Sequence, residues 1–117
     1  MSIDQLAKDF TQAVAEEREA DYQAYWAEDI VSLEPDDGPM SRCEGREALL
    51  QKHAWWHENT EVHSSSTDGP YVFGDQFAVN YAMDVTMDGE RNEMREVGLY
   101  TVKDGKIAEE RFFYGQH

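Results

Sequence analysis

The sequence predicts a single α+β domain over residues 1–117, helical in its first half and a twisted antiparallel sheet in its second. Apolar residues recur at helical spacing before Asn59, whereas large apolar residues alternate with small or polar ones after it. Asp-Gly pairs at 88–89 and 104–105 separate the alternating segments, as hairpin turns do. Helices and strands that are segregated along the chain favour α+β over a parallel α/β sheet.

Three helices are predicted in the first half. Ser2 and Gln5 have capping-box spacing, and the apolar pattern that follows predicts a helix over residues 3–17. Asp21 can cap a second, shorter helix. This second helix is expected to carry Tyr22, Tyr25 and Trp26. A third helix is predicted over 46–57, with Leu49, Leu50, His53, Ala54 and His57 on one face and Trp56 on its border.

The remaining elements are expected to be strands. A short strand over 29–33 ends at Glu34-Pro35, because proline lacks the backbone donor of a sheet ladder, and a turn follows at Asp36-Asp37-Gly38-Pro39. The clearest strand, 77–87, places large apolar residues on one face and small or mixed residues on the other. The others are 62–67 with a continuation at 71–73 after an interruption at Asp68-Gly69-Pro70, then 91–102 and 107–114.

Composition limits the partners and the compartment. The chain carries 25 Asp+Glu against 10 Lys+Arg, a formal net charge of −15, so neither nucleic acid nor an anionic membrane is an expected partner. Cys43 is the only cysteine, which excludes an intrachain disulfide and fits a reducing compartment. The first residues lack a signal-peptide pattern and no apolar run could span a bilayer, so the protein is expected in the cytoplasm.

Four fragments, in a fixed order, carry a resemblance to a known family. They are Asp21 with Tyr25-Trp26 and Asp29, Gly45-Arg46-Glu47-Ala48-Leu49, Gly74-Asp75-Gln76-Phe77-Ala78-Val79, and Tyr100-Thr101-Val102-Lys103-Asp104-Gly105-Lys106-Ile107 followed by Glu110-Arg111-Phe112-Phe113-Tyr114. With these fragments the chain resembles the NTF2-like superfamily, and within it the SnoaL-like and ketosteroid isomerase-like proteins. The resemblance implies a cone-shaped, cystatin-like roll, with three helices from the first half packed against a curved antiparallel sheet around an internal pocket. Members include isomerases, cyclases, dehydratases, epoxide hydrolases and proteins without catalysis, so the fold does not define the function.

The resemblance also implies a homodimer formed through the sheet. The small face of the 77–87 strand would let another sheet approach closely, and it is formed by Ala78, Asn80 and Ala82.

Glu34 is the first candidate for chemistry. Ketosteroid isomerase-like proteins are similar here, with a general-base Asp followed by Pro near the same strand end, and a carboxylate in an apolar pocket can shuttle a proton. The alternative is a solvated carboxylate in an acidic loop. The isomerase also needs two oxyanion donors, and Phe10 and Gly98 stand at the matching positions, so steroid isomerase activity is not expected.

Histidines form a second set of candidates. His53 and His57 share a helix face, but no acid lies between them in a metalloprotease pattern, so no metal is expected. The alternative for His53 is a partly buried histidine with one satisfied nitrogen. His63 begins a strand where SnoaL-like proteins often place a polar pocket residue, and a neutral histidine there could act as acid or base.

Strand parity supplies a third set. Alternation places Glu96 and Tyr100 on one face, and Glu110 and Phe112 on one face of the next strand. If these faces are concave, both carboxyls point inward and are paired, protonated or functional; the alternative is a cross-strand ion pair on the outer face. Phe10, Phe73 and Phe77 are expected in the core. The aromatic residues expected at the cavity wall are Trp26, Trp56, Tyr81 and Tyr100.

These residues leave two hypotheses open, an enzyme and a non-catalytic module. As an enzyme, the pocket would catalyse proton transfer on a small, largely apolar, oxygenated compound, as an isomerase, cyclase or dehydratase without metal or organic cofactor. Glu34 or His63 would be the acid or base, and Tyr100 or Tyr81 would donate a hydrogen bond. The expected ligand-binding residues are Trp26, His53, Trp56, Tyr81, Glu96, Glu110 and Phe112. The alternative is a non-catalytic ligand-binding or dimerisation module of the same fold.

Overall fold

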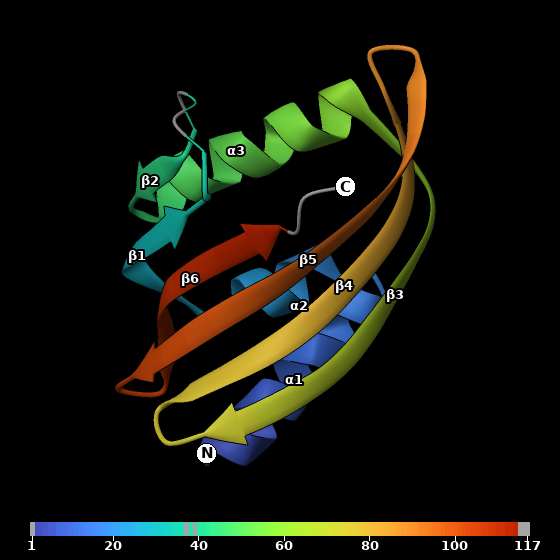
Figure 1. Ribbon diagram of the computed structural model, residues 1–117. Coiled ribbons are helices and arrows are strands. Elements are labelled where there is room, and N and C mark those ends of the chain that lie inside the picture. The colour runs from blue at the N-terminus through green and yellow to red at the C-terminus, as the bar shows by residue number, and fades with distance from the viewer. Residues whose placement is uncertain (1, 37, 39, 115–117) are drawn as a thin grey trace.

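The computed structural model describes residues 2–36, 38 and 40–114, so Asp37 and Pro39 of the predicted turn lie outside the described residues. The elements, in chain order, are α1 (Ile3–Ala15), α2 (Glu19–Gln23), β1 (Trp26–Leu33), β2 (Arg42–Glu44), α3 (Arg46–Asn59), β3 (Thr60–Phe73), β4 (Gln76–Met87), β5 (Glu90–Lys103) and β6 (Lys106–Tyr114) (Figure 1). The predicted α+β class is confirmed. No helix in the described part of the chain has the length and apolar character needed to cross a membrane.

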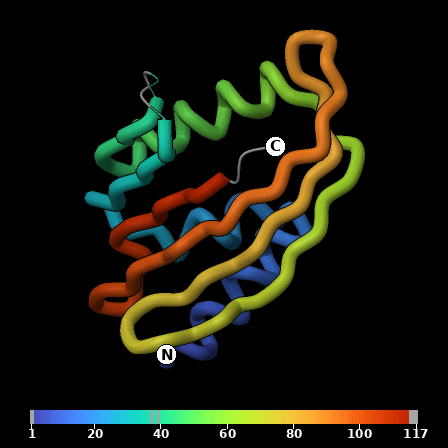
Figure 2. Tube along the Cα trace, in the orientation of Figure 1, coloured from blue at the N-terminus to red at the C-terminus, as the bar shows by residue number. Residues whose placement is uncertain are grey.

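The six strands form one curved sheet in the order β2-β1-β6-β5-β4-β3. The long strands β3, β4 and β5 bend around α1 and α2, and α3 lies across the end of the sheet near β1 and β2 (Figures 1 and 2). The sheet is mixed rather than wholly antiparallel, because β1 pairs with β6 in parallel. That pairing comes about because β6 returns from its hairpin with β5 in the same direction as β1.

Several element boundaries differ from the prediction. Trp26 begins β1 instead of ending the second helix, and Arg18 rather than Asp21 is the residue before α2. The short β2 was not predicted, because three residues are too few to show alternation. β3 runs without a break through the Gly69-Pro70 step and absorbs it as a register shift against β4 between Asp68 and Tyr71.

The core lies between α1 and the inner face of the sheet. Phe10 of α1 contacts Phe77 and Tyr100, with ring centroids 5.9 and 5.0 Å apart, and all three side chains are buried. The prediction for Phe73 is wrong, since its side chain is 50% exposed. Its neighbour Val72 is the cross-strand partner of Phe77 and shares the inner face, so Phe73 points to the outer face.

The buried face of α3 is also not the predicted one. Leu49 is fully buried, but Leu50 and Ala54 are exposed, while Lys52, His53 and Trp56 are half-buried. The helix therefore presents a partly polar face to the interior. A helix that covers a cavity rather than a packed core has this composition, because its inward side chains need not all be apolar.

Candidate functional site

A cavity of about 660 Å³ lies between α3 and the inner face of β4, β5 and β6. This volume is within the usual range of small-molecule pockets. Most of the residues predicted for the site line it: Trp26, Glu34, His53, Trp56, Tyr81, Glu96, Tyr100, Glu110 and Phe112. Alternation along β5 and β6 explains why these side chains meet. Every second residue of a strand points to the same face of the sheet, and so does its partner on the neighbouring strand.

His63 is the predicted site residue that lies elsewhere. Its side chain is exposed, and its Nε2 lies 2.8 Å from Oγ1 of Thr86. Val85 is buried on the inner face, so the adjacent Thr86 faces outward and His63 lies on that outer face with it. His63 lies where the register of β3 against β4 shifts, between Val62 and Ser64.

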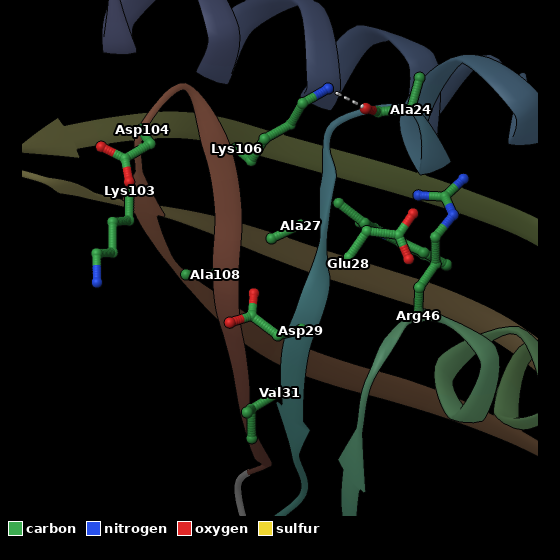
Figure 3. A pocket seen from close by; sticks show the side chains of 11 residues that line it. Ala24, Ala27, Glu28, Asp29, Val31, Arg46, Lys103, Asp104, Lys106 and Ala108 are labelled. Carbon is green, nitrogen blue, oxygen red and sulfur yellow. Dashed lines mark hydrogen bonds between the residues drawn. The ribbon is translucent and has the colours of Figure 1, made fainter.

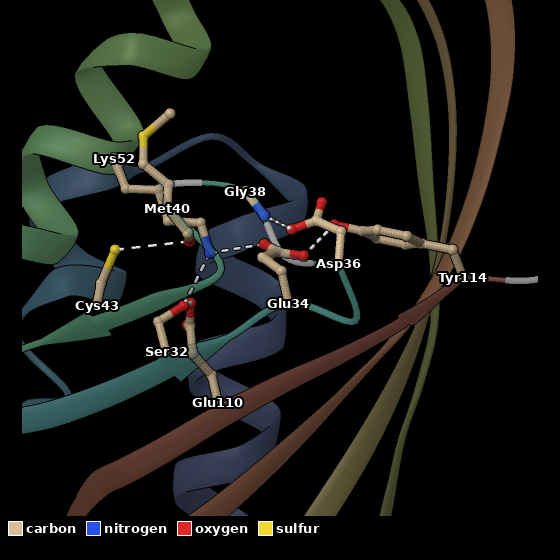
Figure 4. Close-up of polar contacts among 9 residues, drawn as sticks. All are labelled: Ser32, Glu34, Asp36, Gly38, Met40, Cys43, Lys52, Glu110 and Tyr114. Atoms are coloured by element: carbon tan, nitrogen blue, oxygen red, sulfur yellow. Dashed lines mark hydrogen bonds and ion pairs between the residues drawn. The ribbon is translucent and has the colours of Figure 1, made fainter.

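A chain of polar contacts crosses one wall of the cavity (Figure 4). Lys52 Nζ lies 2.6 Å from Oε1 of Glu34 and donates to Oγ of Ser32 at 2.9 Å. Ser32 Oγ donates to Oε2 of Glu110 at 2.8 Å, and the Tyr114 hydroxyl donates to Oε2 of Glu34. Both oxygens of Glu34 are therefore engaged, which differs from the free base and from the solvated loop carboxylate that the sequence suggested.

Two other carboxyls face the cavity with altered acidity. Burial raises the pKa of Glu96 to about 7, and the nearby Glu34 charge adds to this effect. Burial likewise raises the pKa of Glu110 to about 7, against the opposing influence of the Ser32 hydrogen bond and the Lys52 charge. Among the described residues, Glu96 has no hydrogen-bond partner that would fix its proton. Glu96 can therefore exchange a proton with a ligand near neutral pH.

Tyr81 and Tyr100 form a pair of hydroxyl groups beside these carboxyls. Their oxygens are 2.6 Å apart, and burial raises the pKa of both phenols, so both remain protonated. Two phenols carry two protons and use one in the bond between them, which leaves one O–H able to donate to a ligand. Tyr81 and Glu96 are cross-strand partners, so their side chains emerge next to each other on the inner face.

Gly98 makes room for this pair. A Cβ at residue 98 would lie 2.8 Å from the Tyr100 hydroxyl oxygen, which is closer than real Cβ contacts come. The Tyr100 ring stacks on Phe77 at 4.9 Å and leans back along β5 toward Glu96. Gly98 occupies the position where the resemblance implied an oxyanion donor, and its lack of a side chain leaves room for the Tyr100 hydroxyl.

His53 and Trp26 form the aromatic wall below α3. Their ring centroids are 5.1 Å apart, and burial together with the Lys52 charge lowers the pKa of His53 to about 4. His53 is therefore neutral at pH 7 and is a wall residue rather than a cation. The indole nitrogen of Trp26 is buried and lacks a hydrogen-bond partner among the described residues.

Two residues of the polar contact chain, Ser32 and Lys52, were not predicted from the sequence. Lys52 follows Leu49 by three positions and precedes Trp56 by four, which places it on the same helix face as these residues. Ser32 follows the buried Ile30 by two positions and so shares its face of β1. The sequence spacing alone was enough to place both residues on inward faces. A buried lysine is not expected without a partner, however, and its partner Glu34 is identified only in the structure.

A second hollow, about 760 Å³, lies on the other face of β1 and β6 (Figure 3). It opens where the register of these strands shifts between Trp26 and Val31. Two of its cations have structural partners, since Arg46 and Lys106 donate to the backbone carbonyl oxygens of Gln23 and Ala24. Its remaining charged side chains are largely exposed, so the cavity under α3 is the better candidate site.

Comparison with known proteins gives one family. The family model described as the SnoaL-like domain matches residues 1–114. A solved protein from Mesorhizobium loti, provisionally described as a SnoaL-like polyketide cyclase, is 53% identical, with a TM-score of 0.94 over 97% of this chain and 100% of that chain. No curated protein matches the sequence.

More distant solved structures share the fold alone. A protein with a cystatin-like fold from Xanthomonas campestris is 20% identical, with a TM-score of 0.82 over 99% of this chain and 92% of its own. A protein with a ketosteroid isomerase-like fold from Catenulispora acidiphila, solved with trimethylamine, is 16% identical, with a TM-score of 0.73 over 92% of this chain and 83% of its own.

Proposed function

The chain belongs to the family of SnoaL-like domain proteins, and we propose that it is a proton-transfer enzyme whose reaction takes place in the cavity under α3. The reaction would be an isomerisation, cyclisation or dehydration of a small, largely apolar, oxygenated compound. The observation that carries the proposal is Glu96, a carboxyl with a pKa of about 7 that faces an aromatic cavity and has no partner among the described residues. Such a group can both accept and give a proton near neutral pH.

The neighbouring groups supply the rest of the chemistry. Removing a proton next to a carbonyl group places negative charge on the carbonyl oxygen, and a hydrogen-bond donor aimed at that oxygen stabilises it. Tyr81 is opposite Glu96 in the sheet, and its bond to Tyr100 leaves one O–H of the pair free to donate. Glu96 would move the proton while the tyrosine pair binds the oxygen, so the step needs neither metal nor organic cofactor.

Glu34 has a positioning role in this mechanism. It neutralises Lys52 and accepts from Tyr114, so it holds these side chains in place instead of reacting with the ligand. Glu110 is a second acid held by Ser32, and its charge would raise the cost of ionising Glu96. Two nearby carboxyls that cannot both ionise easily keep one proton available over a broad pH range.

The relative from Mesorhizobium loti supports the choice of reaction class. Its provisional description names a SnoaL-like polyketide cyclase and adds carbohydrate phosphatase in brackets. An aldol-type cyclisation begins with removal of a proton next to a carbonyl group, a step that a carboxyl base can carry out. The relative's 53% identity and complete coverage make a shared pocket chemistry a reasonable proposal for this chain.

Deuterium exchange tests the proposal directly. The protein would be incubated in D2O with a simple ketone such as 2-nonanone, and loss of the proton signals beside the carbonyl would be followed by NMR. We expect Glu96→Gln to slow protein-dependent exchange by about 100-fold or more, because a general base contributes that much. Glu93→Gln, an exposed carboxylate of the same strand, is the matched control. Ketone binding without any exchange would instead support the alternative, a ligand-binding module without catalysis.

We also propose a homodimer formed through the outer face of the sheet. Three large side chains on that face are about half exposed: Tyr71, Phe73 and Phe113. The half-buried Ala78 and Ala82 lie on the same outer face of β4 and would let a second sheet approach. Exposed aromatic groups gathered on one face favour an interface over bulk solvent.

A reducing compartment such as the cytoplasm is proposed as well. Cys43 is a buried free thiol, and it donates to the Met40 carbonyl oxygen at 3.8 Å. An unmodified cysteine that packs as a small apolar residue is common in reduced proteins.

A further inference from the structure

Methionine is concentrated in one place in this protein. All four methionines among the described residues line the cavity under α3: Met40, Met83, Met87 and Met94. Trp55 and Trp56 line it as well. Methionine is flexible and polarisable, so it forms apolar walls that adapt to ligands of different shape. This concentration therefore describes what the cavity binds, and not only how the core packs.

Strand register places these residues relative to the reacting groups. Met83 and Met94 are cross-strand partners, one step along the same face from the Tyr81 and Glu96 pair. Two residues of a strand cover about 7 Å, so the backbone of the methionine pair lies about that far along the strands from the backbone of Tyr81 and Glu96. Met87 continues the same face of β4, about 20 Å along the strand from Tyr81. The cavity thus has a polar end and a methionine end.

Burial of the lining gives the cavity a direction. At the tyrosine end, Tyr100 and Trp26 are 2% and 3% exposed. At the methionine end, Met83 and Met94 are half-buried and Trp55 is 42% exposed. The cavity is therefore closed at Tyr100 and Trp26, whereas Tyr81 and Glu96 are half-buried like the methionines next to them. A ligand whose oxygen reaches the tyrosine pair has its remaining atoms along the methionines.

The charges of the lining select against an anionic ligand. Four carboxyl residues line the cavity: Glu34, Asp36, Glu96 and Glu110. Lys52 also lines the cavity, but its ammonium group is bound to Glu34 and Ser32. His53 is neutral because burial lowers its pKa to about 4. A ligand carboxylate would find no unengaged cation among these groups and would be repelled by any carboxyl that is ionised.

We infer that the cavity takes an uncharged amphipathic molecule in one orientation, with a carbonyl or hydroxyl oxygen at Tyr81 and a flexible apolar chain along Met83, Met94 and Met87. The position of the oxygen rests on the proposed function, whereas the position of the chain rests on the lining alone. Because methionine side chains adapt, the wall accepts chains of different length and saturation rather than one rigid ring system. The compound class is that of long-chain ketones and secondary alcohols.

The test measures binding without turnover. Tryptophan fluorescence or calorimetry would follow titration of the protein with 2-alkanones of six to twelve carbons and with the alkanoates of the same lengths. We expect the affinity for ketones to rise about three- to fourfold for each added methylene, because each one is removed from water. Alkanoates should bind at least about tenfold more weakly than ketones of equal length at pH 8, which is above the pKa of about 7 of Glu96 and Glu110.

Variants separate the two ends of the cavity. Met83→Ala should flatten the dependence on chain length, whereas Met83→Leu should keep it, because leucine retains most of the apolar surface. Tyr81→Phe should weaken all ketones by a similar factor and leave the chain-length slope unchanged. Equal affinity for short and long ketones, or equal binding of alkanoates and ketones by the wild-type protein, would overturn the inference.

The same titrations distinguish this inference from the proposed function. If affinity rises with chain length but Glu96→Gln leaves deuterium exchange unchanged, the compound class stands and the catalytic role of Glu96 falls. If exchange depends on Glu96 but affinity does not depend on chain length, the catalytic role stands and the methionine wall does not bind the ligand.

Discussion

Ser32 Oγ donates to Oε2 of Glu110 at 2.8 Å, across the parallel pair of β1 and β6. The two residues are directly in register, and both are buried, Ser32 completely. Because Ser32 donates its hydroxyl hydrogen to Glu110, its oxygen accepts a hydrogen bond from Lys52. The bond fixes which oxygen of Glu110 faces the wall and which one faces the cavity.

Removing this hydroxyl should make Glu110 a weaker acid. The Ser32 hydrogen bond lowers the pKa of Glu110, so Ser32→Ala should raise that pKa above its value of about 7. It should also destabilise the fold by about 1–3 kcal/mol, because buried polar groups lose their partner. Carbon-13 NMR of the glutamate carboxyls and urea unfolding would measure both effects. Ser66→Ala, at an exposed position on β3, is the control, and an unchanged titration of Glu110 would contradict the assignment.

Glu96 should make the stability of the protein depend on pH. Its pKa is about 7 in the folded state and close to 4.5 when exposed. Between these values the folded protein holds a proton that the unfolded chain has lost, so the free energy of unfolding falls as pH rises from 4.5 to 7. Glu96→Gln should reduce this fall and raise stability above pH 7 by roughly 1–3 kcal/mol relative to wild type. Urea titrations at several pH values would measure it, and the same profile in Glu96→Gln and wild type would exclude a buried acid.

His53 should act in the opposite direction at acid pH. Its pKa is lowered from 6.5 to about 4, so the unfolded chain binds a proton that the folded protein does not. The free energy of unfolding therefore falls as pH drops from 6.5 to 4. His53→Phe keeps an aromatic ring against Trp26 and should remove this acid loss. His63→Gln on the outer face serves as the comparison, and it should leave the acid limb as in wild type.

Gly98 should tolerate no side chain without moving Tyr100. In Gly98→Ala the new methyl would meet the Tyr100 hydroxyl at 2.8 Å, so the ring must shift away from Tyr81. We expect a loss of about 1–3 kcal/mol of stability, typical of overpacking, and weaker ketone binding. Tyr100→Phe removes the hydroxyl and leaves the ring, so comparing the two variants separates displacement of the ring from loss of the hydroxyl. Wild-type binding in Gly98→Ala would show that the tyrosine pair does not contact the ligand.

The proposed dimer predicts a particle of twice the 13.5 kDa chain mass in sedimentation velocity at micromolar concentration. Val97 lies on the outer face as the cross-strand partner of Phe113. Val97→Glu should raise the dissociation constant about 100-fold or more, since it places like charges opposite each other in a symmetric interface. Gln51→Glu adds the same charge on an exposed position of α3 and should not change the mass. A wild-type particle of 13.5 kDa would remove the dimer.

The sequence was most informative where a pattern repeats. Alternation along 91–102 and 107–114 was enough to place Glu96 and Glu110 on one face, and the structure has both facing the cavity. Two expectations that did not rest on alternation differ from the structure. Phe73 was expected in the core as an aromatic residue, and His63 in the pocket from the family resemblance, but both lie on the outer face. Both belong to β3, where two register irregularities change the face that successive residues occupy. Those irregularities depend on pairing with β4, so the sequence of β3 alone does not contain them.

The contacts that define the site are long-range, and this limited what the sequence could predict. The partners of Glu34 are Lys52 and Tyr114, which are close only after α3 and β6 have both packed. Glu34 was therefore predicted as a free or solvated carboxylate, whereas in the structure it contacts Lys52 and Tyr114. Local patterns give the face of each element, whereas the pairing of faces is a property of the assembled sheet.

The central place of β6 also determines the order in which this protein can be built. β6 is the last strand in the sequence, yet in the sheet it separates β1 from β5. Until its residues have left the ribosome, β1 and β5 each have an unpaired edge, and the cavity lacks Glu110 and Phe112. Contacts this distant along the chain close slowly, so both edges are open to pairing with other chains until the strand between them is in place.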